Sequence, residues 1–406
     1  MGRFAHLIYR TDSFRNNTSN LYDLITVYDE MVYRDQVFFG LMRHRDTYAD
    51  DMHHNRLQFS ISYDNRGAVA STFNNHVRVP RGTATGTATR VQSLPEHALA
   101  HEIGHVHQII SFMSGGLYGG GDAWPGMLEM SNDIMSNYIT AIRGIPNVTG
   151  GYDTAWNTVL TSENKNYQDI VGGYSNPGMV PLWQLELYFG KVLGDTPKLG
   201  DYLTDIAADP SSLSDAEYKE RYDGFYPRLY ESIRDFAKNH KGEATRLQYQ
   251  AQFVRLACEA AQMNLLDFFD RKWKFLAVRD NLTQEYADNI RNQIKAKNWP
   301  EPKVAMEYIT DFNKEIFRQQ KNIVKGTTTY YEVTKQADIR GWKYVLAYEV
   351  REGGPDGRLV KLVTPFYKDG IESGYDDNAS VSLGGISNPK VYAVQYDGER
   401  IEIEIQ

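Results

Sequence analysis

Two histidines with a carboxylate beside the first could hold a metal ion. His101 and His105 stand four residues apart, and Glu102 follows His101 directly. Residues four apart share one face of a helix, so both imidazoles can reach one ion while Glu102 reaches a water beside it. This pattern, with a third ligand from elsewhere, is typical of a hydrolytic zinc centre with one open coordination position. The alternative is a surface helix with two solvated histidines.

An acidic pair further along the chain can complete the centre. Glu129 and Asp133 are also four residues apart, so on a helix they too share a face. We predict Glu129 as the third metal ligand and Asp133 as the acceptor for the ring N–H of a ligand histidine. The alternative is that Glu129 is an exposed helical carboxylate.

A helix must carry the two histidines. Ser93 and Glu96 form an S-x-x-E capping pattern with Pro95 between them, which predicts a helix that starts at Ser93. Apolar residues cover much of its surface, namely Ala98, Leu99, Ala100, Ile103, Val106, Ile109, Ile110 and Phe112. Such a helix is buried, and buried His and Glu side chains need partners, which a metal supplies.

A second helix must carry the acidic pair. A glycine-rich stretch ends in Asp122, a good N-cap, and a helix is predicted from about 123 to 143, ending before Gly144. His97 lies on the same stripe as the two motif histidines. Three histidines on one straight helix would span about 12 Å, too far for one ion, so we expect His97 to line the cleft or to be solvated. His107 lies off this stripe.

The residues around these motifs resemble the M60 and M60-like (enhancin-like) metallopeptidases. The H-E-I-G-H at 101–105 is followed by a glycine-rich gap and by W-P-G-M-L-E-M-S-N-D at 124–133. Further similar segments lie at 180–189, 225–227 and 258–269, so the resemblance extends over about residues 5–275.

This resemblance implies a secreted zinc endopeptidase of the gluzincin group, often one that acts on mucins and other O-glycosylated proteins. It also implies a zinc triad of His101, His105 and Glu129. The family's common E-V-T-N-N reads E-M-S-N-D here. The role of Asp133 therefore rests on helix geometry and not on the family.

Composition excludes several classes of protein. The formal net charge is −8, which argues against a nucleic-acid partner. No run of eighteen apolar residues occurs, so we predict no transmembrane helix. The single cysteine, Cys258, excludes an intramolecular disulfide and is expected to be buried. No signal-peptide pattern opens the chain, so we expect an exported protein to be represented here by its mature part or by a fragment.

The first 92 residues predict a sheet subdomain. We expect a strand at 6–10, a helix at 21–41, a strand at 57–63 and a strand at 68–80 that returns after a turn at 64–67. The segment 71–77 is a candidate for the edge strand that pairs with an extended substrate, or else it is an ordinary strand.

The remainder predicts a helical lobe and a β domain. Amphipathic runs at 181–191 and 246–275 indicate helices. Alternation near 344–348 and 359–363, and two strands joined at Asp397-Gly398, indicate a small antiparallel sandwich. This domain could be a structural appendage or could bind glycan or protein.

We therefore predict an α+β protein with a zincin-type catalytic domain at 1–320 and a β-sandwich-like domain at 325–406. The catalytic domain would comprise a sheet subdomain (1–92), the zinc-binding helices (93–145) and a helical lobe (146–320).

The predicted function is that of a secreted zinc-dependent endopeptidase acting on glycoproteins, including mucin-like O-glycosylated ones. Zn²⁺ is the cofactor, Glu102 is the general base for a zinc-activated water, and the location is extracellular or at the cell surface. One alternative is a glycan- or mucin-binding protein with a vestigial metal site, and another is a zinc hydrolase of a non-peptide substrate. The donor for the oxyanion is left open between Tyr174, Tyr138 and other tyrosines.

Overall fold

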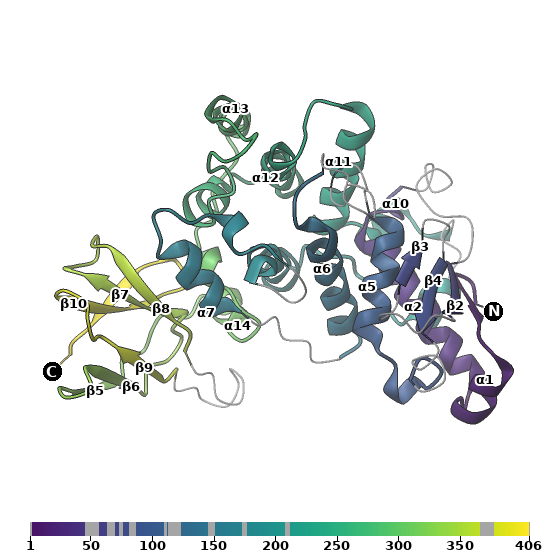
Figure 1. Ribbon diagram of the computed structural model, residues 1–406, viewed down its shortest axis with the longest axis horizontal. Coiled ribbons are helices and arrows are strands. Elements are labelled where there is room, and N and C mark those ends of the chain that lie inside the picture. Colours follow the sequence, from purple (N-terminus) through teal and green to yellow (C-terminus); the bar gives the residue numbers. More distant parts are fainter. Residues whose placement is uncertain are drawn as a thin grey trace. The chain divides into compact units, whose positions relative to one another are not determined.

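The protein folds into two compact units. The computed structural model describes residues 2–44, 57–62, 70–72, 76–80, 87–108, 112, 123–144, 151–172, 177–207, 212–365 and 377–405. Unit 1 comprises Met1–Asn147 and Asp195–Tyr249, and unit 2 comprises Val148–Gly194 and Gln250–Gln406. Each unit combines helices with a sheet (Figure 1), so the predicted α+β class is confirmed.

Unit 1 carries the metal-binding motif. Its helices are α1 (Thr11–Asn17), α2 (Leu21–Phe38), α5 (Glu96–His107), α6 (Met127–Ile142), α9 (Tyr202–Ala207), α10 (Asp215–Tyr222) and α11 (Phe225–Asn239). Its strands are β1 (Ala5–Ile8), β2 (Leu57–Ser62), β3 (Ala70–Thr72) and β4 (His76–Pro80).

The four strands of unit 1 form one sheet in the order β1-β2-β4-β3. Strands β1, β2 and β4 are parallel, and only β3 runs antiparallel, beside β4. The expected hairpin between 57–63 and 68–80 is therefore wrong, because the hairpin is formed by β3 and β4 instead. Alternation in the sequence identifies a strand with one buried face, but it does not identify the partner of that strand.

Helix α2 forms the centre of the unit 1 core. Most of its residues from Val27 to Phe38 are buried, as expected for a helix covered on several sides. The Phe38 ring lies 4.8 Å from the rings of Tyr138 and Tyr226, and 5.5 Å from that of Tyr230. This aromatic cluster joins α2 to α11 and to α6, the helix that carries Glu129 and Asp133.

Helix α5 begins later than the capping pattern predicts. It starts at Glu96, and no side chain caps its N-terminus. Leu94, which precedes Pro95, is extended with ψ 132° because a residue before proline is excluded from the helical region. Glu96 pairs with Arg143 instead of capping the helix. The predicted capping box at Ser93 is therefore wrong.

Helix α6 also begins later than predicted, at Met127. The residue before it, Gly126, has φ +82°, a left-handed conformation in which glycine is favoured. The predicted N-cap, Asp122, lies outside the described residues. The later start leaves Glu129 in the first turn of the helix.

Unit 2 begins with helical segments. Its helices are α7 (Tyr152–Ala155), α8 (Val180–Leu185), α13 (Gln284–Lys295) and α14 (Lys314–Gln319), together with most of α12 (Leu247–Ala261). Three π-helical segments lie at Trp156–Leu160, Glu186–Val192 and Asp267–Lys272. Cys258 is buried in α12, as expected. Across the described parts of both units, no helix has the length and apolar character needed to cross a membrane.

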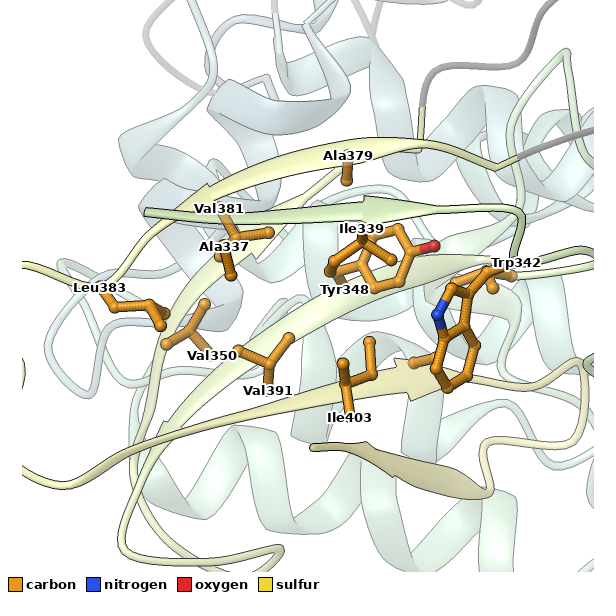
Figure 2. Close-up of a cluster of buried hydrophobic side chains, with 12 residues drawn as sticks. Ala337, Ile339, Trp342, Tyr348, Val350, Ala379, Val381, Leu383, Val391 and Ile403 are labelled. Atoms are coloured by element: carbon orange, nitrogen blue, oxygen red, sulfur yellow. The ribbon is translucent and has the colours of Figure 1, made fainter. Parts of the chain in front are cut away.

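Two antiparallel sheets complete unit 2. The strands are β5 (Thr327–Tyr331), β6 (Gln336–Arg340), β7 (Ala347–Glu352), β8 (Leu359–Val363), β9 (Ala379–Ser382), β10 (Pro389–Val394) and β11 (Arg400–Ile403). One sheet has the order β11-β10-β7-β8 and the other β5-β6-β9. Their facing side chains share one apolar cluster (Figure 2), which includes Ile339 from β6 and Val350 from β7. A sandwich packs its core in this way.

The sandwich is also joined to the helical segments of unit 2. The Asn157 side chain exchanges two hydrogen bonds of 2.8 Å with the backbone of Leu362 in β8. The Tyr308 hydroxyl donates to Glu349 in β7 at 2.7 Å. Because of these contacts, the sandwich and the helical segments belong to one compact unit. The predicted domain boundary near residues 320–325 stays a prediction.

Candidate metal centre

The candidate site lies between α5 and α6 in unit 1, which run side by side (Figure 1). His101 contacts Asp133 and His105 approaches Glu129, so residue numbers rise along one helix as they fall along the other. The helices are therefore antiparallel. His101 and His105 lie on one face of α5, and Glu129 and Asp133 lie on the face of α6 that packs against it.

The same pairing continues beyond the site. His97 forms a side-chain hydrogen bond with Asn137, one turn further along each helix. His97 is half-buried, and burial lowers its pKa; that it lines the cleft or is solvated stays a prediction. At the far end, Arg143 of α6 forms ion pairs with Glu96 of α5 and with Glu30 of α2. These contacts hold the register of the two helices.

His101 is held by a carboxylate on each side of its ring. Its Nδ1 lies 2.8 Å from Asp133 Oδ1, and its Nε2 lies 2.8 Å from Glu129 Oε2. Asp133 is buried, and the His101 side chain is only 7% exposed. Both carboxylates accept a proton from the ring, and loss of the Nε2 proton would free that nitrogen's lone pair for a cation while Nδ1 still donates to Asp133.

His105 approaches the same oxygen from the next turn. Its Nε2 lies 3.7 Å from Glu129 Oε2, and its ring centre lies 4.9 Å from that of His101. One donor atom from each of His101, Glu102 and His105 lies within 4.8 Å of the other two. Two imidazole nitrogens and a carboxylate oxygen from Glu129 therefore converge on one point, with the Glu102 carboxylate beside it.

The carboxylates change the ionisation of the site. Burial opposes protonation of His101, but hydrogen bonds with Asp133 and Glu129 outweigh it and raise its pKa to about 9. Burial and the neighbouring His101 lower the pKa of His105. The hydrogen bond with His101 lowers the pKa of Glu129. Glu129 is therefore ionised at neutral pH, which is the form that binds a cation.

Gly104 lets the two helices approach closely. A Cβ at this position would lie 2.6 Å from Met135 Cε and 2.8 Å from Asn132 Oδ1. A larger residue would displace the side chains of Met135 and Asn132 on α6. The glycine inside the motif thus allows close packing of α5 against α6 beside the site.

Two further contacts at the end of α5 were not predicted from the sequence. His107 forms a short hydrogen bond through Nδ1 with the fully buried Asp35 of α2. His105 Nδ1 lies 3.1 Å from Gln108 Oε1. The only sequence signal for Gln108 is its position three residues after His105, one helical turn away.

The donor set matches what zinc requires. Zn²⁺ takes imidazole nitrogen and carboxylate oxygen in sites of low coordination number, with a hydrogen-bonded partner behind each histidine. His101, His105 and Glu129 could supply three such donors, with Asp133 and Gln108 as the partners of the two rings. The chemistry of the residues thus fits a zinc ion.

The remaining sequence candidates are only partly described. Of the segment 71–77, the structure places Ser71 and Thr72 in β3, which is an edge of the described sheet and contacts α5. It places His76 and Val77 in β4, which lies between β2 and β3 and is not an edge. Tyr174 lies outside the described residues. Tyr138 is buried in the aromatic core of unit 1, 2% exposed.

The fold and this donor set define the catalytic fold of the zincin class. A sheet, a helix with two histidines four residues apart and a second helix with a glutamate occur together in unit 1. The chain belongs to the family described as Peptidase M60, enhancin and enhancin-like, whose model matches residues 1–274. A search of curated protein sequences returned no significant match.

Solved structures show the same fold. A metallopeptidase from Bacteroides thetaiotaomicron is 18% identical in sequence, with a TM-score of 0.64. The match covers 99% of the present chain and 64% of the Bacteroides chain. A metallopeptidase in complex with Tn antigen is 19% identical, with a TM-score of 0.64, and the match covers 99% of the present chain and 71% of the other.

The M60 catalytic domain of ZmpC from Clostridium perfringens, in complex with the sialyl T antigen, is 15% identical with a TM-score of 0.54. That match covers 94% of this chain and 62% of the other. The present chain thus spans less than two thirds of the length of the Bacteroides structure.

Proposed function

We propose that this protein is a zinc-dependent endopeptidase that cleaves glycoproteins, including mucin-like O-glycosylated ones, outside the cell or at its surface. The observation that carries the proposal is the meeting of the His101 and His105 Nε2 atoms at Glu129 Oε2. Membership of the M60 family supports a metallopeptidase.

In this proposal, His101, His105 and Glu129 hold the ion. Zinc bound there supplies a Lewis acid that polarises a peptide carbonyl and makes a water nucleophilic at neutral pH. Asp133 accepts the Nδ1 proton of His101 and so keeps the ring in the tautomer whose Nε2 can bind a cation. Gly104 keeps α6, and with it Glu129, close to the histidines.

Glu102 is proposed as the general base. It stands one residue after the first ligand, and a carboxylate there lies within 4.8 Å of a nitrogen of each histidine. It takes the proton of the water that attacks the peptide carbonyl, and it delivers that proton to the leaving amine as the C–N bond breaks. An extended substrate would pair its backbone with the edge strand β3, which contacts α5.

The substrate class is inferred from relatives of the same fold. Two of them were solved with Tn antigen and sialyl T antigen, which are carbohydrate epitopes. We infer that the present chain also acts on proteins that carry O-linked glycans. The low identities mean that the particular sugar and cleavage site must be measured.

Zinc content and chelation test the proposal. Purified protein is expected to hold about one zinc per chain, to cleave an O-glycosylated protein faster than unglycosylated casein, and to lose cleavage on chelation and regain it with Zn²⁺. Sequencing of the new chain ends would identify the bond that is cut. Protein without bound zinc and without cleavage would contradict the proposal. Glycoprotein binding that survives chelation, with no cleavage at any stage, would favour the glycan-binding alternative, and products with intact peptide bonds would favour a non-peptide hydrolase.

A further inference from the structure

The second ligand histidine is held differently from the first. His101 Nδ1 faces the carboxylate of Asp133 on α6, whereas His105 Nδ1 faces the amide oxygen of Gln108, 3.1 Å away. Gln108 is the residue at which α5 ends, and its backbone N–H still bonds to Gly104. Its side chain therefore lies beside the last turn of the helix, next to His105, and it is only 7% exposed.

The surroundings of Gln108 determine which end of its amide faces His105. Its Nε2 donates to the backbone oxygen of Leu128 and, at 2.7 Å, to Ser131 Oγ. The Ser131 hydroxyl itself donates to the backbone oxygen of Met127 at 2.9 Å, so toward Gln108 it accepts. Both Nε2 protons of Gln108 thus meet acceptors, and the amide oxygen must point the other way, toward His105.

This orientation determines the tautomer of His105. An amide oxygen only accepts, so Nδ1 of His105 must carry the proton and donate it to Gln108. The neutral ring then presents the Nε2 lone pair toward Glu129 Oε2, as a metal ligand requires. The hydrogen bonds run in one sense from His105 through Gln108 and Ser131 to Met127, in the first turn of α6.

We propose that Gln108 is the positioning residue of His105 and that it couples this ligand to the turn of α6 that carries Glu129. The inference rests on the metal centre proposed above. Leu128, to which Gln108 is anchored, directly precedes Glu129. The amide oxygen therefore sets the ring orientation of His105, and the bonds of Nε2 to α6 set the orientation of the amide. The amide performs this without adding a second buried carboxylate to the site.

Two substitutions of Gln108 distinguish its role as the acceptor that orients His105 from a purely structural role in holding the two helices together. Gln108→Met keeps the length and volume of the side chain but removes its polar atoms. Gln108→Glu also loses the bonds donated to Leu128 and Ser131, but it retains an acceptor for His105. We expect Gln108→Met to bind Zn²⁺ roughly 10- to 100-fold more weakly than wild type, measured by competition with a chromophoric chelator. Gln108→Glu is expected to recover most of that loss.

Ser131→Ala is the matched control, because it removes one anchor of Gln108 and leaves the acceptor for His105 in place. Its zinc affinity should stay close to that of wild type. The absorption spectrum of Co²⁺-loaded protein should change in Gln108→Met and not in Ser131→Ala. Thermal unfolding of each chelator-treated variant gives the stability of the fold independently of the metal. If Gln108→Met does not fold, Gln108→Glu is compared with Ser131→Ala. Positioning predicts zinc affinity close to that of wild type in both variants, and a clear loss of affinity in Gln108→Glu contradicts it.

Equal zinc affinities of Gln108→Met and wild type would overturn this inference alone. So would equal losses in Gln108→Met and Gln108→Glu, because bracing of the helices would then explain both. Wild-type protein that binds no Zn²⁺ would overturn this inference together with the proposed function.

Discussion

The interface of α5 with α6 and the core of the sandwich are both buried, yet they are built from opposite kinds of residue. Between the helices lie buried polar side chains, among them His101, Gln108 and Asp133. Between the sheets lie apolar side chains, which Figure 2 shows pointing toward one another. Buried polar groups are costly unless they are hydrogen-bonded, whereas apolar burial stabilises a fold directly.

The polar interface shows signs of this cost. Asn132 is fully buried, and its side-chain amide has no hydrogen-bond partner among the described residues. The ion pair of Arg143 with Glu96 joins α6 to α5 at one end of the interface, and near the other end the contact of His107 with Asp35 joins α5 to α2. An interface arranged in this way presents donors to a ligand, while the apolar core serves packing. The difference between the two regions should appear in how each responds to substitution.

The largest effect is expected for Glu102→Gln. The substitution keeps the size of the side chain and removes its ability to take a proton, so peptide hydrolysis should fall by roughly 10²- to 10⁴-fold. Zinc content and melting temperature should remain those of wild type, because Glu102 is not a predicted ligand. Glu163→Gln, at an exposed position, is the control. A variant that cleaves as fast as wild type would show that Glu102 is not the base.

A smaller effect, of a different kind, is expected in the sandwich. Ile339→Ala removes a fully buried side chain and should lower the free energy of unfolding by about 2–5 kcal/mol. Zinc affinity of the folded protein should not change, since the residue belongs to the apolar core of unit 2. Chemical denaturation and chelator competition measure the two quantities. Val333→Ala, at a position 97% exposed, should leave both unaltered. A loss of zinc affinity in Ile339→Ala would break the contrast between the regions.

The smallest effect concerns the dependence of stability on pH. In protein stripped of metal, the pKa of His101 is about 9, above its ordinary value of 6.5. A raised pKa in the folded state stabilises the protein fully below pH 6.5, and this contribution is lost as the pH rises through 9. The loss should be on the order of 1–3 kcal/mol, seen as a falling melting temperature between these values.

Asp133→Asn provides the control for this pH dependence, because it removes the charge that favours protonated His101. Its melting temperature should depend less on pH over the same interval. Saturation with Zn²⁺ should also weaken the dependence, because a bound cation replaces the proton on Nε2. An identical pH profile for Asp133→Asn would assign the effect to other groups.

Much of the fold could be predicted from local patterns. Helical spacing identified α2, and alternation identified β2 and β8, because apolar side chains recur with the period of a helix or of a strand in these segments. The helix ends were less predictable. Ser93 and Asp122 are good N-cap residues, but Pro95 disfavours the helical conformation at Leu94, and Gly126 adopts the left-handed conformation at the start of α6.

The sequence by itself determined the residue types of the site and their four-residue spacing, since the geometry of a helix places such residues on one face wherever the helix lies. Only the tertiary structure decided which stripe faces which. The antiparallel packing of α5 on α6 brings His101 to Asp133, His97 to Asn137 and the anchored Gln108 to His105. Those pairings depend on the register between two helices, and a register is set by the whole packed interface, beginning with the close contact at Gly104.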